Sequence, residues 1–420
     1  MSFPIPTLRR EHGRLVLEDS PLDDIAERFG TPTYVYSAEA MTASYRAYHE
    51  ALSAIDATVC FAVKANSNLA VLSLFARLGA GFDIVSGGEL SRVLAAGGSA
   101  DRVVFSGVGK RRDEIAYALE AGIRCFNIES TTELETISEL ASGLGRSAPI
   151  AFRVNPDVDP RTHPYISTGL RGNKFGVPIS DAFELYRRAH AMPALVVSGV
   201  ACHIGSQLLD PAPVAEAADR VLALVDRLAG AGIVLDHVDL GGGLGIRYRN
   251  ERPPAIGDYL APLIARMGGR RESLFLEPGR SLVGNAGLLL TRVELLKQGE
   301  EKNFAVVDAA INDLARPALY DAYHDIEPVH ADAAESRRYD VVGPVCESGD
   351  FLGRDRDLAV RSGDLLAVLS AGAYGMTMSS NYNSRPRAAE VLVRGRQCIL
   401  ARQRESVDDL MRGEHPLPAD

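Results

Sequence analysis

The sequence predicts an α/β protein: a (β/α)8 TIM-type barrel followed by a mainly antiparallel β domain of the barrel or sandwich type. Three observations support this fold class. The chain has 420 residues, which is more than one ordinary hydrophobic core accommodates. Between Thr58 and about Pro278, short apolar runs alternate with longer amphipathic stretches, as expected for strands and helices in turn. After Gly279 the runs stay strand-like, while the helical period largely disappears.

The barrel is predicted from eight strand-like runs. They cover residues 58–64, 82–86, 102–106, 124–128, 149–155, 195–203, 235–242 and 273–279. Nearly apolar strands that alternate with helices pair in parallel, and eight such units fit a closed barrel better than an open sheet. An open doubly wound sheet is the alternative, because periodicity does not show closure. In both architectures ligands bind at the carboxyl ends of the strands.

Helices are expected between these strands, for example at 69–80, 88–98 and 132–145, where apolar residues recur every three or four positions. The β domain is predicted from runs at 287–298, 302–312, 337–348, 364–375 and 389–400. We expect segment 12–20 to add a strand to that domain, and the charged residues from about 401 to form a surface helix or a loose tail. The expected domains are 36–280 for the barrel, and 1–35 with 281–420 for the β domain.

The composition is that of a soluble globular enzyme, with 46% hydrophobic and 24% charged residues. Lys and Arg number 45 and Asp and Glu 55, so the net charge is −10. An acidic chain without a basic run is a poor partner for nucleic acid or an anionic membrane. No signal-peptide pattern or membrane-spanning run is found, so a cytoplasmic protein is expected. Of five cysteines, Cys60, Cys125 and Cys202 lie in apolar runs as small buried hydrophobes, and no metal site is predicted.

Polar residues end most of the predicted barrel strands. They are Lys64, Asp83 with Ser86, Arg153 with Asn155, His203 with Ser206, Gly241 to Gly243, and Glu277 with Arg280. In a barrel these side chains converge around one mouth. A lysine, a histidine, a carboxylate, an arginine and a glycine-rich turn together suit a phosphorylated, nitrogen-containing aromatic cofactor.

Each of these signals also has a structural alternative. Lys64 at the end of a buried strand either carries a reactive amine or extends its charge to the surface. The GGGLG turn at 241–245 either brings N–H groups to a phosphate or is a tight structural turn, and it matches neither the dinucleotide fingerprint nor a P-loop. His203 is either a functional imidazole or a core histidine bound to the backbone. Glu277 either meets a pyridinium nitrogen or forms a local ion pair with Arg280.

Six motifs then occur in the order and spacing of a known family. They are VKAN with Lys64, HIGSQ with His203, GGGLG, EPGR, GPVCESGD and AGAYG. In these motifs the chain resembles the pyridoxal-phosphate decarboxylases of the alanine-racemase-like barrel group, and most closely the family of diaminopimelate decarboxylases. Segment 155–176 is also similar to that family. Together these features run from about residue 30 to residue 390, and the ordered set is far more specific than any one motif.

The resemblance implies pyridoxal 5'-phosphate as the cofactor, with Lys64 bound to it as a Schiff base. An amine that attacks an aldehyde must be partly neutral, and burial beside a cationic ring favours that state. The resemblance also implies that His203 stacks on the cofactor ring and that Glu277 pairs with the ring nitrogen. The residues similar to the family's other cofactor contacts are Asp83, Ser206, Gly242, Gly243, Gly279, Arg280 and Tyr374.

The reaction implied is decarboxylation of meso-2,6-diaminopimelate to L-lysine, the last step of lysine biosynthesis. Cys346 matches the family's proton donor, which reaches the site from a partner subunit, so a homodimer with shared active sites follows. A half-buried thiol is the alternative for this cysteine. The residues similar to the family's substrate contacts are Arg280, Arg316, Tyr320, Glu347 and Tyr374. The distal carboxylate and ammonium of this substrate need one cation and one anion, although a surface ion pair is the alternative for Arg316.

Other functions stay open at this point: an ornithine or arginine decarboxylase, a racemase on the same fold, or a non-catalytic carrier of the cofactor. Ornithine-type enzymes hold no distal carboxylate and usually lack the glutamine of HIGSQ and the serine-glycine of CESGD. The β domain, with Cys346, Glu347 and Tyr374, argues against a carrier or a purely structural protein. Asp350 is expected to be an exposed turn carboxylate or an interface residue, and segment 155–176 is the expected lid.

Overall fold

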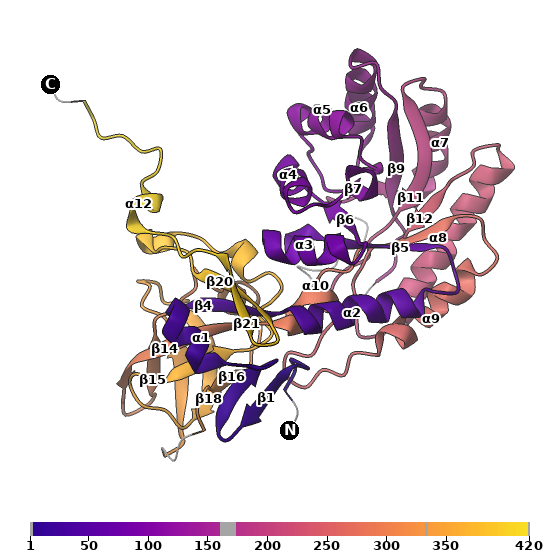
Figure 1. The fold of residues 1–420 in the computed structure, drawn as a ribbon. Coiled ribbons are helices and arrows are strands. Elements are labelled where there is room, and N and C mark those ends of the chain that lie inside the picture. The colour runs from indigo at the N-terminus through magenta and orange to yellow at the C-terminus, as the bar shows by residue number, and fades with distance from the viewer. Residues whose placement is uncertain (1–2, 160–173, 332–334, 419–420) are drawn as a thin grey trace. The chain divides into compact units, whose positions relative to one another are not determined.

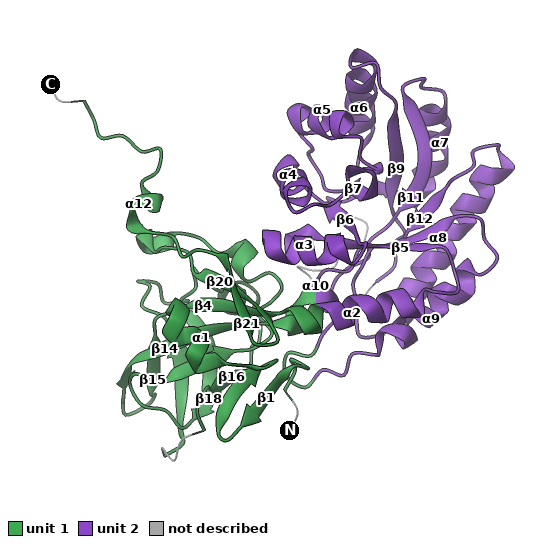
Figure 2. Ribbon diagram, viewed as in Figure 1, with its two compact units in different colours: residues 1–41, 247–250, 283–420 green, residues 42–246, 251–282 purple. Residues whose placement is uncertain are grey.

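The computed structural model describes residues 3–159, 174–331 and 335–418, and Figure 1 shows the order of their elements. The chain divides into two compact units, coloured separately in Figure 2. Unit 1 comprises residues 1–41, 247–250 and 283–420, and unit 2 comprises residues 42–246 and 251–282. Within the described ranges, no helix is both long and apolar enough to cross a membrane.

Unit 2 contains a closed barrel of parallel strands, so the predicted barrel is confirmed and the open sheet is ruled out. Among the described residues its ring consists of β5 (Ala57–Ala62), β6 (Gly81–Ile84), β7 (Val103–Phe105), β8 (Cys125–Ile128), β9 (Ala148–Asn155), β11 (Leu195–Ala201), β12 (His237–Asp239) and β13 (Ser273–Leu276). Closure comes from β13, which pairs in parallel with β5. A short strand, β10 (Val177–Pro178), pairs with the end of β9.

A helix follows each barrel strand, and the longer ones cover the outside of the ring (Figure 1). These helices are α3 (Leu69–Arg77), α4 (Gly87–Ala95), α5 (Arg112–Ala121), α6 (Thr131–Gly143), α7 (Ile179–His190), α8 (Ala212–Gly230), α9 (Ile256–Met267) and the short α10 (Arg280–Val283). Polar side chains mark several helix starts. Asn68 accepts the Ala70 N–H, and Ser86 and Ser130 cap α4 and α6 in the same way. A further helix, α2 (Ala38–Ala51), precedes β5.

Six of the eight barrel strands end earlier than the apolar runs suggested, whereas β8 and β9 end where predicted. Lys64 lies in a 3-10 turn, η1 (Val63–Ala65), after β5, and Ser86 is the cap of α4. His203 follows the end of β11 by two residues, and Glu277 comes directly after β13. Residues beyond the hydrogen-bonded ladder need not alternate between its two faces, so these side chains are able to gather at the carboxyl ends of the strands.

The inside of the barrel contains a packed apolar cluster. One cluster of buried residues comes from five different strands: Cys60, Val104, Cys125, Ala151 and Phe275. The burial predicted for three cysteines is confirmed, since Cys60, Cys125 and also Cys202 are buried and unpaired. The barrel is therefore a packed core, and its chemistry must lie at the strand ends.

Unit 1 is built on a mainly antiparallel sheet, as predicted. Its strands are β4 (Thr33–Ser37), β14 (Gly287–Lys297), β15 (Phe304–Val307), β16 (Ile326–Pro328), β17 (Arg337–Val342), β18 (Phe351–Leu358), β19 (Leu365–Val368), β20 (Ala389–Arg394) and β21 (Gln397–Arg402). Two of its pairings, β15 with β17 and β20 with β4, are parallel. The unit also contains the short helices α1 (Leu22–Phe29), α11 (Arg316–Tyr320) and α12 (Val407–Leu410).

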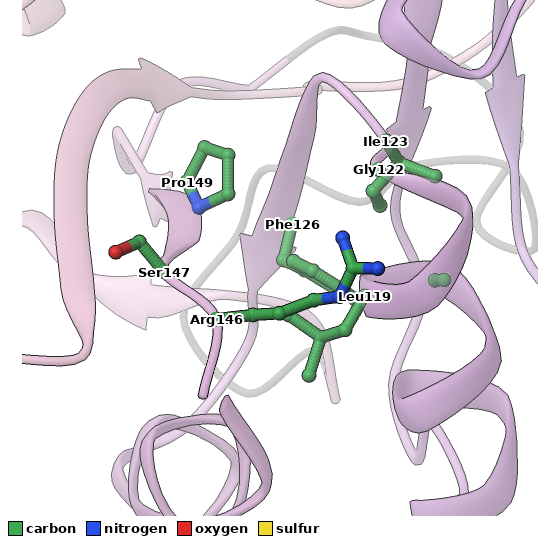
Figure 3. Close-up of a pocket in the computed structure, with 8 residues that line it drawn as sticks. Leu119, Gly122, Ile123, Phe126, Arg146, Ser147 and Pro149 are labelled. Carbon is green, nitrogen blue, oxygen red and sulfur yellow. The ribbon is translucent and has the colours of Figure 1, made fainter. Parts of the chain in front are cut away.

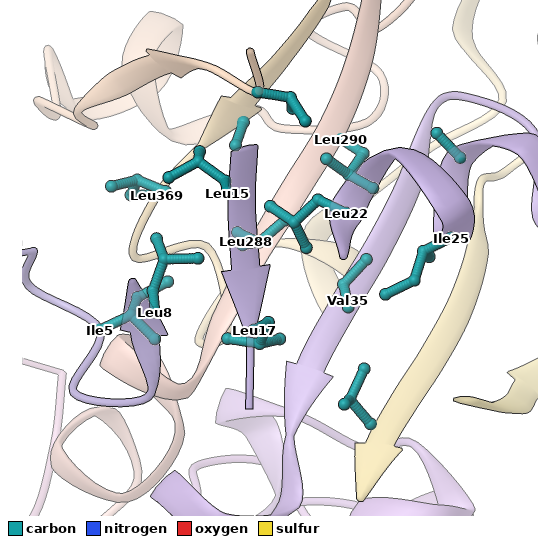
Figure 4. Packing of buried hydrophobic residues seen from close by; sticks show 14 of the residues in the cluster. Ile5, Leu8, Leu15, Leu17, Leu22, Ile25, Val35, Leu288, Leu290 and Leu369 are labelled. Atoms are coloured by element: carbon teal, nitrogen blue, oxygen red, sulfur yellow. The ribbon is translucent and has the colours of Figure 1, made fainter. Parts of the chain in front are cut away.

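The predicted N-terminal strand is confirmed as part of unit 1, where it belongs to a small sheet of its own. Segment 12–20 contains β2 (Arg14–Leu17), which pairs with β1 (Leu8–Glu11) and β3 (Ser20–Pro21) in a separate small sheet. The strand that joins the large sheet is β4, because all five of its residues are buried between β14 and β20. Figure 4 shows Leu15 and Leu17 of the small sheet beside Leu288 of the large one, so a single hydrophobic core joins both sheets.

Candidate active site

Two cavities are compared for their chemistry. One, of about 410 Å³, opens at the carboxyl ends of the barrel strands and has the size of a small-molecule site. It is lined by Lys64, Val85, Ser106, Gly107, Val108, Asn127, Arg153, Phe175, Ala201, Cys202, His203 and Glu277. The other, of about 420 Å³, lies at the amino ends of β8 and β9, where Arg146 extends over Leu119 (Figure 3). Only the first combines an amine, an imidazole and a carboxyl group, so it is the candidate active site.

Lys64 is held by a buried carboxylate at the cavity. Its Nζ atom lies 2.5 Å from Oδ2 of Asp83, whose side chain is fully buried, while that of Lys64 is 39% exposed. Asp83 stands on β6 directly beside Ala62 at the end of β5. The amine is thus paired with a buried carboxylate at the cavity, which favours the reactive-amine prediction over the surface alternative for this lysine.

Glu277 belongs to a group of three carboxyl groups, with Asp83 and Asp239. Burial and the negative charges of Asp239 and Asp83 raise the pKa of Glu277 well above its ordinary value, and burial also raises the pKa of Asp239. Ser106 and Asn127 approach Oε1 of Glu277 at 3.4 Å each. A carboxyl group that keeps its proton near neutral pH is able to donate it to a ring nitrogen.

His203 is a half-buried imidazole beside two cations. Burial, followed by the positive charges of Arg153 and Lys64, lowers the pKa of His203 well below its ordinary value. The Gly242 N–H approaches Nδ1 of His203 at 3.4 Å. At neutral pH the ring is therefore uncharged, and it offers the flat apolar face that an aromatic cofactor requires.

The glycine turn after β12 has no room for side chains. A Cβ atom on Gly242 would lie 2.4 Å from the Glu277 carbonyl oxygen, and one on Gly243 would lie 2.6 Å from Leu208. Gly243 also has a φ of 116°, which L-residues rarely adopt. The structural explanation of this turn therefore holds, and the absence of side chains also allows a phosphate to approach its backbone closely.

Gln207, the glutamine of HIGSQ, fastens two loops together. Its Nε2 donates to the Ile246 carbonyl at 2.7 Å, and its Oε1 accepts the Ile246 N–H at 3.2 Å. In the sequence, this glutamine indicates only which class of substrate the family decarboxylates. The structure gives it a positioning role, because it fixes the HIGSQ turn against the glycine turn.

Ser206, Gly279 and Arg280 come together at the barrel end. Nε and Nη2 of Arg280 both donate to Oγ of Ser206 at 3.2 Å, and Arg280 is only 7% exposed. A Cβ atom on Gly279 would lie 2.9 Å from Cβ of Ala65, so this turn passes very close to the lysine turn. A hydroxyl, a guanidinium and glycine backbone are a donor set suited to an anion.

These barrel residues fit the phosphorylated aromatic cofactor that the sequence predicts. An amine beside a buried carboxylate suits an aldehyde, and a protonated carboxyl group suits a ring nitrogen. The second oxygen of Asp83, Oδ1, is buried and has no hydrogen-bond partner among the described residues, so the site contains polar capacity that the protein itself does not use.

Of the predicted substrate residues, Arg280 lies in unit 2 and the others lie in unit 1. Arg316 begins α11 and is only 7% exposed, so it is not a surface ion pair. Its Nη1 donates to the Tyr248 hydroxyl at 2.8 Å. Tyr320, the last residue of α11, is half-buried. Tyr374 is half-buried too and has a φ of 55°, a left-handed conformation uncommon for tyrosine.

Cys346 and Glu347 lie in the loop that follows β17, not in a strand as the 337–348 run suggested, and both side chains are exposed. Asp350 holds this loop from inside: its Oδ1 accepts the Ile311 N–H at 2.6 Å and its Oδ2 the Val345 N–H at 2.9 Å. At 4% exposure Asp350 is buried, so the expected exposed turn carboxylate is wrong. On its outer side, the loop's Cys346 N–H donates to Oδ1 of Asn383 at 2.9 Å.

Most of the expected lid, 160–173 within segment 155–176, lies outside the described residues. The described end of the segment is attached to the barrel. Glu129 accepts the Gly176 N–H at 2.7 Å and a hydrogen bond from Nη1 of Arg153 at 3.1 Å. The Arg153 guanidinium in turn lies over the Phe175 ring, 4.7 Å from its centroid. Two cavity-lining residues, Arg153 and Phe175, are thereby held in place.

Comparisons with known proteins agree with this geometry. A family model described as the pyridoxal binding domain of pyridoxal-dependent decarboxylase matches residues 38–284. The diaminopimelate decarboxylase of Pseudomonas aeruginosa is 60% identical over 412 residues, covering 98% of this chain and 99% of the relative. That of Neisseria meningitidis is 56% identical over 400 residues, covering 95% and 97%.

Solved structures of diaminopimelate decarboxylases share the whole fold. The structure from M. jannaschii matches with a TM-score of 0.94 at 40% identity, covering 99% of each chain. The structure from Helicobacter pylori, complexed with L-lysine, matches with a TM-score of 0.90 at 42% identity, covering 93% of this chain and 98% of the relative. By sequence, by fold and by the chemistry at its barrel mouth, the chain belongs to the diaminopimelate decarboxylase family.

Proposed function

We infer that this chain removes carbon dioxide from meso-2,6-diaminopimelate to form L-lysine, with pyridoxal 5'-phosphate as cofactor. It is a carboxy-lyase, and the reaction is the last step of lysine biosynthesis. The observation that carries the inference is 60% identity, over nearly the full length, to a relative named diaminopimelate decarboxylase. Two solved relatives are complexes with L-lysine. The ornithine, arginine and racemase alternatives are not favoured by these likenesses.

The cofactor would be held by barrel residues with distinct tasks. Nζ of Lys64 would bind its aldehyde carbon, the His203 ring would cover one face, and Glu277 would meet the ring nitrogen. The phosphate and the remaining contacts would come from Asp83, Ser206, Gly242, Gly243, Gly279, Arg280 and Tyr374. When bound, pyridoxal phosphate supplies an electron sink for the electron pair left by the departing carboxylate. Glu277 would support that sink, because a carboxyl group hydrogen-bonded to the ring nitrogen stabilises the protonated ring.

The protein's own groups would complete the reaction. Asp83 orients the Lys64 amine, and the Cys346 thiol gives its proton to the carbon that has lost carbon dioxide. Arg316, with Arg280, Tyr320 and Tyr374, would bind substrate, and the Glu347 carboxylate would take the distal ammonium. We propose that Cys346 acts from the partner subunit of a homodimer, as the family resemblance implies.

The direct test is release of carbon dioxide from meso-diaminopimelate by purified protein, with and without added pyridoxal phosphate. Lysine, ornithine and arginine serve as control substrates. We expect cofactor-dependent release with L-lysine as the product, and loss of both turnover and covalently bound cofactor in Lys64→Ala. The control Lys302→Ala changes an exposed lysine of unit 1 that pairs with Asp340, and it should keep full activity. Release from ornithine or arginine alone, or full activity of Lys64→Ala, would contradict the proposed function.

A further inference from the structure

We propose that His324 and Tyr248 are positioning residues that hold the Arg316 guanidinium ready for the distal carboxylate of the substrate. This inference deepens the proposed function, since it rests on the substrate role of Arg316. The family motifs contain neither residue: Tyr248 lies in the short segment 247–250 that belongs to unit 1, and His324 follows α11 by four residues. Their role is visible only in the three-dimensional arrangement.

The guanidinium of Arg316 is oriented by contacts of two kinds. Its Nη1 donates to the Tyr248 hydroxyl at 2.8 Å and to Nε2 of His324 at 3.2 Å. The guanidinium carbon also lies 4.8 Å from the centroid of the Tyr248 ring, a cation–π distance. The Tyr248 and His324 rings meet edge to face, with centroids 5.4 Å apart. Hydrogen bonds and ring contacts together restrict both the plane and the direction of the cation.

The chemistry of its two partners fixes the protonation state of His324. Nδ1 lies 2.8 Å from the Leu369 carbonyl oxygen, which only accepts, so Nδ1 carries the proton. Nε2 faces the Arg316 guanidinium, which only donates, so Nε2 offers its lone pair. His324 is therefore neutral in this arrangement. A neutral imidazole and a phenol orient the guanidinium without cancelling the charge that a carboxylate needs.

His324 is itself firmly held. Its side chain is fully buried, and its backbone carbonyl accepts a hydrogen bond from Nη2 of Arg356 at 2.9 Å. The Arg356 guanidinium lies 3.7 Å from the centroid of the Tyr323 ring. The imidazole thus has little freedom to follow a moving arginine. Pre-orientation of this kind raises affinity because less side-chain freedom is lost when the carboxylate binds.

The test compares two inhibitors of the holoenzyme. L-lysine retains the distal carboxylate, whereas cadaverine has no carboxylate. We expect His324→Phe and Tyr248→Phe to raise the inhibition constant of L-lysine and the KM for diaminopimelate, each about 10-fold. The inhibition constant of cadaverine and kcat should each stay within about twofold to threefold of the wild-type values.

His324→Gln, which keeps an acceptor for Arg316, should restore much of the lysine affinity. The control His330→Phe removes a half-exposed imidazole that pairs with Asp23 in the same unit. It should change neither the two inhibition constants nor KM and kcat.

A double-mutant cycle separates this inference from the proposed function. If His324 acts through Arg316, His324→Phe should have no further effect on lysine affinity in an Arg316→Ala background. Unchanged lysine affinity in Arg316→Ala alone would overturn the proposed substrate role of Arg316. If Arg316→Ala weakens lysine while the His324 and Tyr248 variants do not, only the positioning role fails. Equal losses for lysine and cadaverine would show a general structural effect and would also overturn it. Should His324→Phe not fold, His324→Gln and Tyr248→Phe decide the question alone.

Discussion

At the scale of single residues, a fully buried carboxylate determines where the Lys64 amine lies. Asp83 is placed by the register between β5 and β6, so the position of the amine follows from two paired strands. Removing one partner of such a pair leaves the other charge buried without compensation, which is strongly unfavourable. The turn after β5 therefore places a lysine beside the buried acid that the neighbouring strand β6 carries.

His237 is a buried polar residue that the proposed chemistry does not use. Its side chain is fully buried at the start of β12, and its ring stacks on Phe275 with centroids 4.5 Å apart. A Cβ atom on Gly199 would lie 2.2 Å from Nε2, so glycine is needed to make room for the imidazole. Within the described part of the chain, neither ring nitrogen has a hydrogen-bond partner. Burial, together with the positive charge of Arg124, lowers the pKa of His237 to about 3.

We expect His237 to make the folded protein sensitive to acid. An unfolded histidine titrates near 6.5, while the folded one stays neutral to about pH 3, so the unfolded state binds more protons below pH 6.5. The free energy of unfolding should therefore fall by about 2 kcal/mol between pH 7.5 and pH 5. His237→Leu should abolish this part of the fall, as measured by urea unfolding at both pH values. The exposed His190→Leu control should retain it, and an unchanged pH dependence in His237→Leu would refute the assignment.

The positions of candidate site residues were predictable where chain topology determines them. Lys64, His203 and Glu277 could be predicted because a polar residue that ends an apolar strand in a βα fold faces the common mouth. Gln207 could not, since the backbone groups it binds are 39 residues away and leave no local pattern. Tyr248 could not be predicted for the same reason, because the arginine that it contacts, Arg316, is 68 residues away in the sequence. Long-range side-chain contacts of this kind require the folded structure.

At the scale of elements, the loop between β17 and β18 depends on one buried carboxylate. Asp350 accepts backbone hydrogen bonds from Ile311 and from Val345, the residue directly before Cys346. The packing around it is tight, because a Cβ atom on Gly343 would lie 2.5 Å from Oδ2 of Asp350. Burial raises the pKa of Asp350. The loop is therefore a fixed element that presents the Cys346 thiol in one place.

Replacing Asp350 by alanine should lower kcat about 10-fold and leave the KM for diaminopimelate nearly unchanged. Two buried N–H groups would lose their acceptor, and a thiol displaced by an ångström transfers its proton poorly. The measurement is steady-state kinetics, together with the rate at which a thiol reagent labels the exposed Cys346. Asp357→Ala serves as the control, because this carboxylate on β18 forms an exposed pair with Arg338. An Asp350→Ala enzyme with normal kcat would show that the loop holds the thiol without this residue.

The elements themselves were predictable to different degrees. The eight barrel strands were found because their apolar runs are long enough to be buried on both faces, although the runs overestimated where strands end. β18 was missed because its sequence, FLGRDRDL, carries four charged residues, as is typical of a strand at the edge of a sheet. β4 was missed because a short buried strand between two helices has no period to recognise. Both segments form strands because they pair with other strands in the folded protein, not because their residues prefer the strand conformation.

At the scale of the whole molecule, the proposed functional residues are divided between the two units. Lys64 and Glu277 belong to unit 2, while Arg316 and Cys346 belong to unit 1. In a single chain the Cys346 side chain is exposed. If the thiol, and not a water molecule, is to give the proton to the carbon, water must be excluded from the site. A partner subunit that covers Cys346 would meet this need, which supports the proposed homodimer.

Subunit exchange tests the shared site. Lys64→Ala and Cys346→Ala are each expected to be nearly inactive as homodimers. Random exchange makes half of the dimers mixed, and a mixed dimer has one site with both wild-type residues if Lys64 and Cys346 meet across the interface. The mixture should therefore recover about a quarter of wild-type activity. Exchange of Lys64→Ala with a chain carrying both substitutions should recover none, because no site then combines the two residues. If the first mixture also stays inactive while exchange is verified by mass, Lys64 and Cys346 act within one chain and the shared site is wrong.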